Sequence, residues 1–123
     1  MRKRMRELIF RGKLHNDGRW IAWSLLGAIF ADKSIEVDFE TVGQYTGLTD
    51  KNGKKIFEGD IVKVTDDNGE TDLCSCGVGE VCLYDGVWYI GDEVNDGLYD
   101  VSKIYYIEII GNIHDNPELL KGE

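Results

Sequence analysis

Apolar and polar residues alternate along several short stretches of the chain. The alternation is most regular at Ile35–Phe39, where Ile, Val and Phe are separated by Glu and Asp. A period of two residues indicates a strand with one buried and one solvated face. Short β-branched and aromatic runs elsewhere also favour strands, although a short helix is the alternative at Arg19–Leu26, where apolar residues fit a helical period as well. The strands predicted in this way are 7–14, 19–26, 35–39, 61–64, 80–84, 87–90 and 103–113.

Glycine-containing turns separate these runs, in a chain with 15 Gly and 1 Pro. The polar residues 65–79 and the acidic residues 91–102 are predicted to be loops. Gly111 predicts a bulge in the last strand, and Asn116 followed by Pro117 predicts a capped helical turn near the C-terminal end. The tight turns predicted from Asp-Gly, Asn-Gly and Glu-Gly-Asp sequences are 15–18, 50–53, 58–60 and 85–86.

Short antiparallel strands bury their edges when they close into a small barrel. We therefore expect a mainly β fold, or a β-rich α+β fold, in which residues 44–123 form a small SH3-like β-barrel. Residues 1–43 would form an N-terminal β-rich subdomain with a basic start, packed beside the barrel. Since the chain has 123 residues, the two parts are expected to make one domain overall.

The charge of the chain is uneven. Residues 1–19 hold seven Lys and Arg against two acids, whereas the remainder holds seven Lys against twenty-one acids. The basic start could bind a polyanion such as a nucleic acid, or it could neutralise the acidic body of this chain or of a neighbouring subunit; we favour the second. A pI near 4.6 also disfavours a general nucleic-acid binder. The candidate polyanion contacts are Arg2, Lys3, Arg4, Arg6 and Arg11.

A further reading of the acidic body is that it mimics DNA and occupies a host DNA-binding protein. It rests only on the excess of acids after residue 19.

No apolar run reaches the roughly 18 to 20 residues that a membrane-spanning helix needs. The longest is Trp20–Phe30, and the polar residues 15–19 separate it from the basic start, which disfavours a signal peptide. Three cysteines are an odd number, typical of free thiols in a reducing compartment. We expect a cytoplasmic protein with no membrane association.

Three sets of residues could catalyse a reaction or bind a metal ion. The first could bind zinc through Cys74, Cys76, Cys82 and His114, but its spacing lacks a C-x2-C pair. A catalytic thiol would need His15 or His114 nearby, and Cys82 in a predicted strand favours a small buried residue. We therefore expect no cofactor.

The paired acids have plainer explanations than catalysis or metal binding. Glu58 and Asp60 flank Gly59, and we expect their carboxylates to accept backbone N–H bonds at a turn. The acids of the 91–102 loop lack the spacing of a calcium loop, so a solvated loop is favoured; they are Asp92, Glu93, Asp96 and Asp100.

Paired aromatics on predicted strands indicate an interface. Adjacent residues of a strand face opposite sides. The pairs Trp88-Tyr89 and Tyr105-Tyr106 must therefore each place one ring away from the local core. Packing or homo-oligomerisation is favoured over a groove for peptides or stacked bases. The candidate interface residues are Trp20, Trp23, Trp88, Tyr89, Tyr105 and Tyr106.

The central run Glu40–Leu48, followed by Asp50–Lys54 and Ile56–Val62, resembles the YopX family of phage and prophage proteins. The start Met5–Arg11 and the closing motifs 108–113 and 116–120 resemble those of the family too. Residues 1–4 then form an extension, and either Met1 or Met5 could be the native start. Gly12-Lys13-Leu14 stands where the family often has Ala-Trp-Asp, and the region from Cys74 to Cys82 is individual.

The resemblance implies a phage-encoded, cytoplasmic, β-rich accessory protein, and it implies no mechanism. Since no catalytic constellation is present, we expect a non-enzymatic binding module that acts through contact with another protein. Nucleic-acid binding through the basic start is the alternative.

Overall fold

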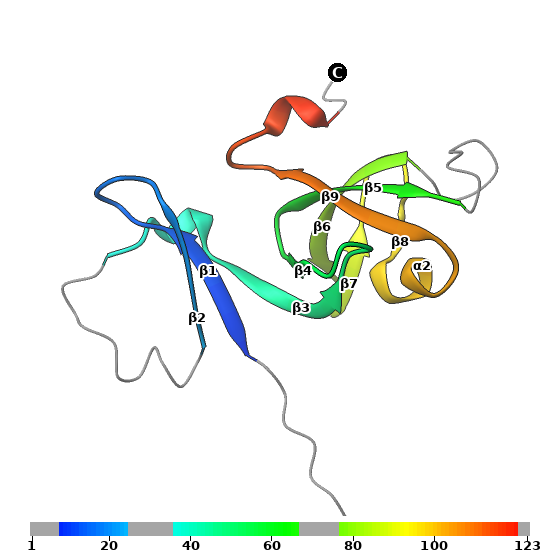
Figure 1. The fold of residues 1–123 in the computed structure, drawn as a ribbon, viewed down its shortest axis with the longest axis horizontal. Coiled ribbons are helices and arrows are strands. Elements are labelled where there is room, and N and C mark those ends of the chain that lie inside the picture. Colours follow the sequence, from blue (N-terminus) through cyan, green and yellow to red (C-terminus); the bar gives the residue numbers. More distant parts are fainter. Residues whose placement is uncertain (1–7, 25–35, 67–76, 121–123) are drawn as a thin grey trace, which may run out of the picture.

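The computed structural model describes residues 8–24, 36–66 and 77–120, and strands dominate it (Figure 1). The strands are β1 (Ile9–Lys13), β2 (Trp20–Ser24), β3 (Gly43–Thr49), β4 (Lys55–Phe57), β5 (Asp60–Thr65), β6 (Gly77–Tyr84), β7 (Val87–Ile90), β8 (Asp96–Gly97) and β9 (Tyr106–Asn112). Within the described ranges the helices are the α-helix α2 (Leu98–Ile104) and two 3-10 helices, η1 (Phe39–Thr41) and η2 (Pro117–Leu119). The prediction of a mainly β fold is confirmed.

The strands form two antiparallel sheets, ordered β2-β1-β3-β4 and β8-β7-β6-β5-β9. Figure 1 shows β3 running from the first sheet towards the second. It starts beside β1, with Gly43 opposite Arg11, and its far end packs Leu48 against the core of the second sheet. The division of the chain at residues 43 and 44, and closure into an SH3-like barrel, stay predictions.

One hydrophobic core lies on the inner face of the second sheet. It combines alternate β-branched residues of the central strands with two residues of α2, so this helix covers part of the core. The buried members are Ile56, Val62, Val64, Val81, Ile90, Val94, Leu98, Val101 and Ile107.

The predicted strand at residues 35–39 is wrong over its described part, 36–39. Val37 makes a single bridge to Leu14, and Phe39, which is 87% exposed, begins η1. The backbone carbonyl of Asp38 accepts bonds from the N–H and the hydroxyl of Thr41, which turns the chain where the alternation predicted that it would stay extended.

The predicted loop at 91–102 contains α2, which sequence reasoning missed. Leu98 and Val101 are buried one helical turn apart, but the acids between and before them suggested a solvated loop. Consequently the last strand begins at Tyr106 rather than at Lys103.

The predicted loop at 65–79 ends too late, since β6 begins at Gly77; residues 67–76 lie outside the described ranges. Gly79 sits inside the strand because a Cβ there would meet the Gly91 carbonyl oxygen at 2.2 Å. This glycine marks a close approach of backbones, which the sequence does not distinguish from a loop.

The predicted turns and the bulge are confirmed. The pairing of β5 with β9 slips by one residue next to Gly111. Asn116 and Pro117 do begin a 3-10 turn, but the Asn116 side chain accepts a bond from the Asn112 N–H instead of capping that turn.

Asp50 fastens the β3–β4 turn to the free edge of β9. Its carboxylate, in a residue only 6% exposed, accepts bonds from the N–H groups of Asn52 and Lys54 in the turn and of Ile109 in β9. The Lys51 N–H adds a bond to the Ile107 carbonyl. Burial alone raises the pKa of Asp50, but the backbone N–H groups and the Lys54 charge outweigh it and hold the pKa below its usual value.

Asp50→Asn should therefore destabilise the protein by about 1–3 kcal/mol, because the amide presents a donor to one of three buried N–H groups. Urea denaturation followed by tryptophan fluorescence measures this difference. Asp85→Asn, at an exposed turn where φ is 53° and Asn is well tolerated, is the matched control and should change stability little. An Asp50→Asn protein as stable as the wild type would show that this carboxylate does not hold the turn.

Candidate functional site

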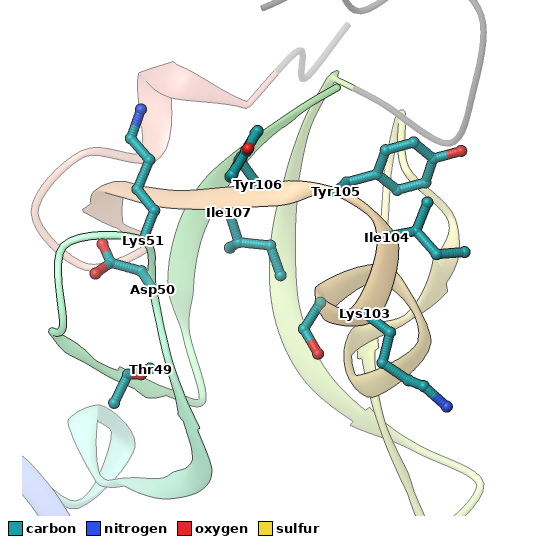
Figure 2. Close-up of a pocket in the computed structure, with 9 residues that line it drawn as sticks. Thr49, Asp50, Lys51, Lys103, Ile104, Tyr105, Tyr106 and Ile107 are labelled. Atoms are coloured by element: carbon teal, nitrogen blue, oxygen red, sulfur yellow. The ribbon is translucent and has the colours of Figure 1, made fainter. Parts of the chain in front are cut away.

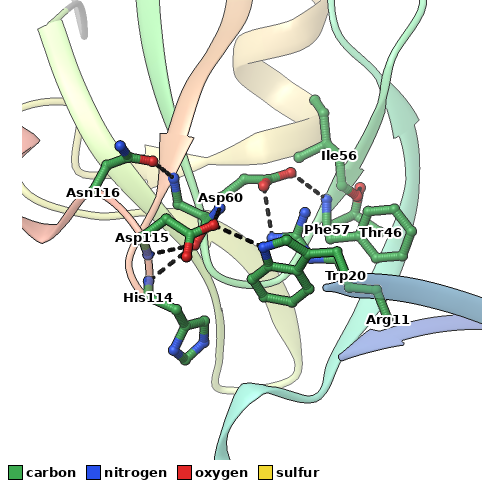
Figure 3. A network of polar contacts seen from close by, with 10 residues as sticks. Arg11, Trp20, Thr46, Ile56, Phe57, Asp60, His114, Asp115 and Asn116 are labelled. Carbon is green, nitrogen blue, oxygen red and sulfur yellow. Dashed lines mark hydrogen bonds and ion pairs between the residues drawn. The ribbon is translucent and has the colours of Figure 1, made fainter. Parts of the chain in front are cut away.

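A buried ion pair joins the two sheets. The Arg11 guanidinium of β1 donates to an Asp60 Oδ at 2.7 Å, and the second Asp60 oxygen accepts the Phe57 N–H at 2.7 Å (Figure 3). Asp60 is 2% exposed. The guanidinium also lies 4.8 Å from the ring centroids of both Trp20 and Phe57. Two rings and a carboxylate thus hold one cation between the sheets.

The pKa of Asp60 shows how burial and the Arg11 charge act on this carboxylate. Burial is the largest effect on Asp60 and raises its pKa above the usual value, while the Arg11 charge and the Phe57 N–H only partly oppose it. A raised pKa in a cleft can indicate a general acid. Here both oxygens are bonded within the protein and the residue is closed to solvent, so the arrangement supports structure rather than catalysis.

A second polar cluster lies beside the first, on the segment after β9. Asp115 accepts the Trp20 indole N–H at 2.7 Å (Figure 3) and the Asn112 amide at 3.2 Å, and it forms an ion pair with Lys13. These partners lower the pKa of Asp115 to about 2, the Lys13 hydrogen bond most. The neighbouring His114 ring is 5.9 Å from the Trp20 ring, and burial, followed by the Arg11 and Lys13 charges, lowers the pKa of His114.

The sequence predicted some of this network. Asp60 accepts a backbone N–H at the Glu-Gly-Asp corner, as expected. Arg11, a candidate polyanion contact, is paired inside the protein, which fits the favoured interpretation that the basic start neutralises the acidic body. Its contact with a polyanion stays a prediction. The other candidates, Arg2, Lys3, Arg4 and Arg6, lie outside the described residues. Sequence reasoning missed Lys13, Asp115 and the indole N–H, because they meet only through sheet packing.

The candidate interface aromatics have different environments. Trp23 stacks on Phe10 with ring centroids 6.3 Å apart. Trp88 and Tyr105 pack against the core, whereas their neighbours Tyr89 and Tyr106 face away from it, as strand alternation requires. Trp20 belongs to the polar network described above. Their contact with a partner stays a prediction.

The metal candidates are not brought together in the described part of the chain. Cys74 and Cys76 lie outside it, while Cys82 is a free thiol whose pKa is raised, chiefly by burial. Across residues 8–24, 36–66 and 77–120, no group of three or more His, Cys, Asp or Glu side chains is placed to hold a metal ion. In the same ranges no helix has the length and apolar character to cross a membrane.

A pocket of about 360 Å³ opens between the β3–β4 turn and the C-terminal end of α2 (Figure 2). Lys51 and Lys103 extend from its two sides away from the space between them. The Asp50 carboxylate in its wall is already bonded to three backbone N–H groups. The pocket therefore gathers no reactive groups. Its lining residues are Thr49, Asp50, Lys51, Ser102, Lys103, Ile104, Tyr105, Tyr106 and Ile107.

Exposed apolar residues gather at the β6–β7 hairpin. Leu83, Tyr84 and Val87 are 55%, 65% and 55% exposed, and they flank the Asp85-Gly86 turn. The sequence predicted this hairpin, but not that its end would project beyond the core. Three large apolar side chains in one exposed turn are typical of an interaction surface.

These features define a mainly β protein whose two sheets are joined by an ion pair and whose β6–β7 hairpin exposes apolar side chains. The family model described as "YopX protein" matches residues 10–121, so the chain belongs to the YopX family, as its motifs predicted. A relative is the SPbeta prophage-derived uncharacterized protein YopX of Bacillus subtilis (strain 168). It is 38% identical over 76 residues, which cover 57% of this chain and 53% of the relative. The chain thus matches about half the length of that relative.

Removal of the Arg11 charge alone should destabilise the protein. Arg11→Met leaves the Asp60 carboxylate buried without its cation, so we expect a loss of about 3 kcal/mol in the free energy of unfolding at pH 7. The loss should shrink at pH 5, because protonation of Asp60 removes the unpaired charge. Urea denaturation at both pH values measures it.

The double variant Arg11→Met/Asp60→Leu is the control, since it removes both charges and should recover much of the lost stability. A single Arg11→Met variant as stable as the wild type at pH 7 would contradict the role of the pair.

Asp115 should contribute to acid stability. Its folded pKa, about 2, lies below the ordinary value of 3.8, so its contribution is complete above about pH 4 and is lost as the pH falls towards 2. Because the side chain is 35% exposed, solvent screening reduces this contribution to about 1 kcal/mol. Asp115→Asn should be less stable than the wild type at pH 6 and equal to it near pH 2.

Thermal denaturation at several pH values checks this expectation. Trp20→Phe keeps the ring and removes the indole N–H donor, so it should lose part of the same pH dependence. If Asp115→Asn kept the full wild-type dependence between pH 4 and pH 2, another group would be responsible.

Proposed function

We propose that this chain is a non-enzymatic binding module that acts through contact with another protein. The observation that carries the proposal is the apolar end of the β6–β7 hairpin, where Leu83, Tyr84 and Val87 are each more than half exposed. Aromatic and aliphatic side chains of this kind form the centre of protein interfaces, where they are removed from water.

The fold supports this proposal because it fixes the hairpin firmly. Val81 and Ile90, which pair two positions before Leu83 and Trp88, are fully buried in the core. The turn itself has Asp85 and Gly86 at φ 53° and 81°, the pair of positive φ values that a tight two-residue hairpin uses. A surface held in one conformation loses little entropy when it binds.

The relative's origin suggests the setting. Since that protein is prophage-derived, we place this chain among phage-encoded accessory proteins of the bacterial cytoplasm. The polar network and the pocket favour no catalytic alternative, because their carboxylates are bonded within the protein.

Affinity capture from a Bacillus subtilis lysate, with and without nuclease, tests the proposal. We expect the wild type to retain a specific protein in both cases, and Leu83→Ser/Val87→Ser to retain at least ten-fold less of it. Ile104→Ser is the matched control, since Ile104 is also an exposed apolar residue, 69% exposed, but lies on α2.

Equal capture by the wild type and the hairpin variant would refute a role for this surface. Capture that disappears with nuclease would favour nucleic-acid binding instead. Circular dichroism and thermal denaturation should show that both variants are folded, because the substituted side chains are exposed.

A further inference from the structure

The β6–β7 hairpin has a second, outward face whose chemistry is more specific than that of its tip. Val81 and Ile90 pair across the strands and are fully buried, so the next pair along, Cys82 and Tyr89, faces the opposite side. Tyr84 shares this outward face, and its ring centroid is 5.4 Å from that of Tyr89. The Tyr89 hydroxyl donates to the Asn95 side-chain oxygen at 2.6 Å, which fixes the ring.

The segment that carries this tyrosine pair is acidic. Residues 77–102 contain six Asp and Glu and no Lys or Arg. Glu80 lies two residues before Cys82 and therefore on the same face. Burial, then the negative charges of Asp92 and Glu58, raises the pKa of Glu80, and no cation is among the causes.

Elsewhere the chain places its own cations over its aromatic rings. Arg11 lies over Trp20 and Phe57, and lysines lie over Tyr45 and Tyr99. Among the described residues, no Lys or Arg is placed over Tyr84 or Tyr89. The pair combines two electron-rich faces with a carboxylate, Glu80, on the same face of the hairpin, and such a surface attracts a cation.

We propose that the outward face of the β6–β7 hairpin binds a basic segment of the partner protein, one that places an Arg or Lys side chain over Tyr84 and Tyr89. Glu80 and its acidic neighbours attract the same segment electrostatically. This inference rests on the proposed function and adds the chemical class of the partner to it. Val87, which pairs with Tyr84 and shares this outward face, then contacts the aliphatic part of that partner.

A labelled peptide of alternating Arg and Gly is the probe, with a peptide of alternating Gln and Gly as its matched control. Fluorescence anisotropy with the full chain should show binding of the Arg peptide that weakens as salt is raised. The Gln peptide should bind at least ten-fold more weakly.

Two variants separate the aromatic from the electrostatic contribution. Tyr84→Leu keeps an apolar side chain but removes the ring, and it should weaken Arg-peptide binding about three-fold. Glu80→Gln keeps the shape and removes the charge, and it should weaken binding about two-fold or more at low salt. The controls are Tyr106→Leu, at an aromatic 50% exposed on β9, and Glu118→Gln in η2; both should bind as the wild type does.

The proposal is overturned if Tyr84→Leu and Glu80→Gln bind the Arg peptide as tightly as the wild type, or if the two controls weaken it equally. It is also overturned if the Gln peptide binds as well as the Arg peptide. Sedimentation that showed self-association abolished by Tyr84→Leu would identify a second copy of the chain as the occupant and would likewise overturn it.

Failure of this inference is distinguishable from failure of the proposed function. If Leu83→Ser/Val87→Ser loses the captured protein while Tyr84→Leu and Glu80→Gln leave peptide binding unchanged, the module binds a protein but not through a basic segment. If the serine variant captures as much as the wild type, the hairpin is not the binding surface at all.

Discussion

The arrangement of the two sheets depends on one buried pair, Arg11 with Asp60. Asp60 opens β5, an interior strand of the second sheet that pairs with both β6 and β9, so a carboxylate at this position is carried into the interior with it. A buried carboxylate without a partner costs several kcal/mol. Arg11 meets this requirement from the other sheet, and the flat guanidinium fits between Trp20 and Phe57 as an ammonium would not.

The rest of the contact between the sheets follows from the placing of Arg11. For Arg11 to reach Asp60, β1 must lie with the Arg11 side chain towards the start of β5. This placement brings Lys13 and Trp20 to Asp115. The Trp20 side chain then makes two polar contacts: its ring packs against the Arg11 cation, and its indole N–H donates to the Asp115 carboxylate. Basic residues of the N-terminal strand and acids of the body thus neutralise one another inside the protein.

The hairpin β6–β7 differs in charge and exposure from this region. It carries Glu80 and Asp85 but no Lys or Arg, and its apolar end lies beyond the core. An acidic hairpin that exposes apolar side chains has a surface suited to a partner. The pocket beside α2 lacks this property, because its carboxylate is already bonded to backbone N–H groups.

The sequence by itself determined the mainly β class, the hairpin around Asp85-Gly86 and the bulge at Gly111. These depend on strand propensity and on backbone conformations that only certain residues adopt nearby, so they are local properties. The family motifs were likewise legible in the sequence. Arg11 could be recognised as a cation. Alternation along a strand also required one ring of Trp88-Tyr89 and one of Tyr105-Tyr106 to leave the core, although it did not say which.

Only the tertiary structure decided which groups meet. It ended the alternating stretch in the 3-10 helix Phe39–Thr41 through bonds to the Asp38 carbonyl, and it made a helix of Leu98–Ile104 because Leu98 and Val101 fill the core. It also selected the internal partner of Arg11, which lies 49 residues away in the chain. Contacts between distant residues depend on the packing of whole sheets, and no local pattern of residues contains that information.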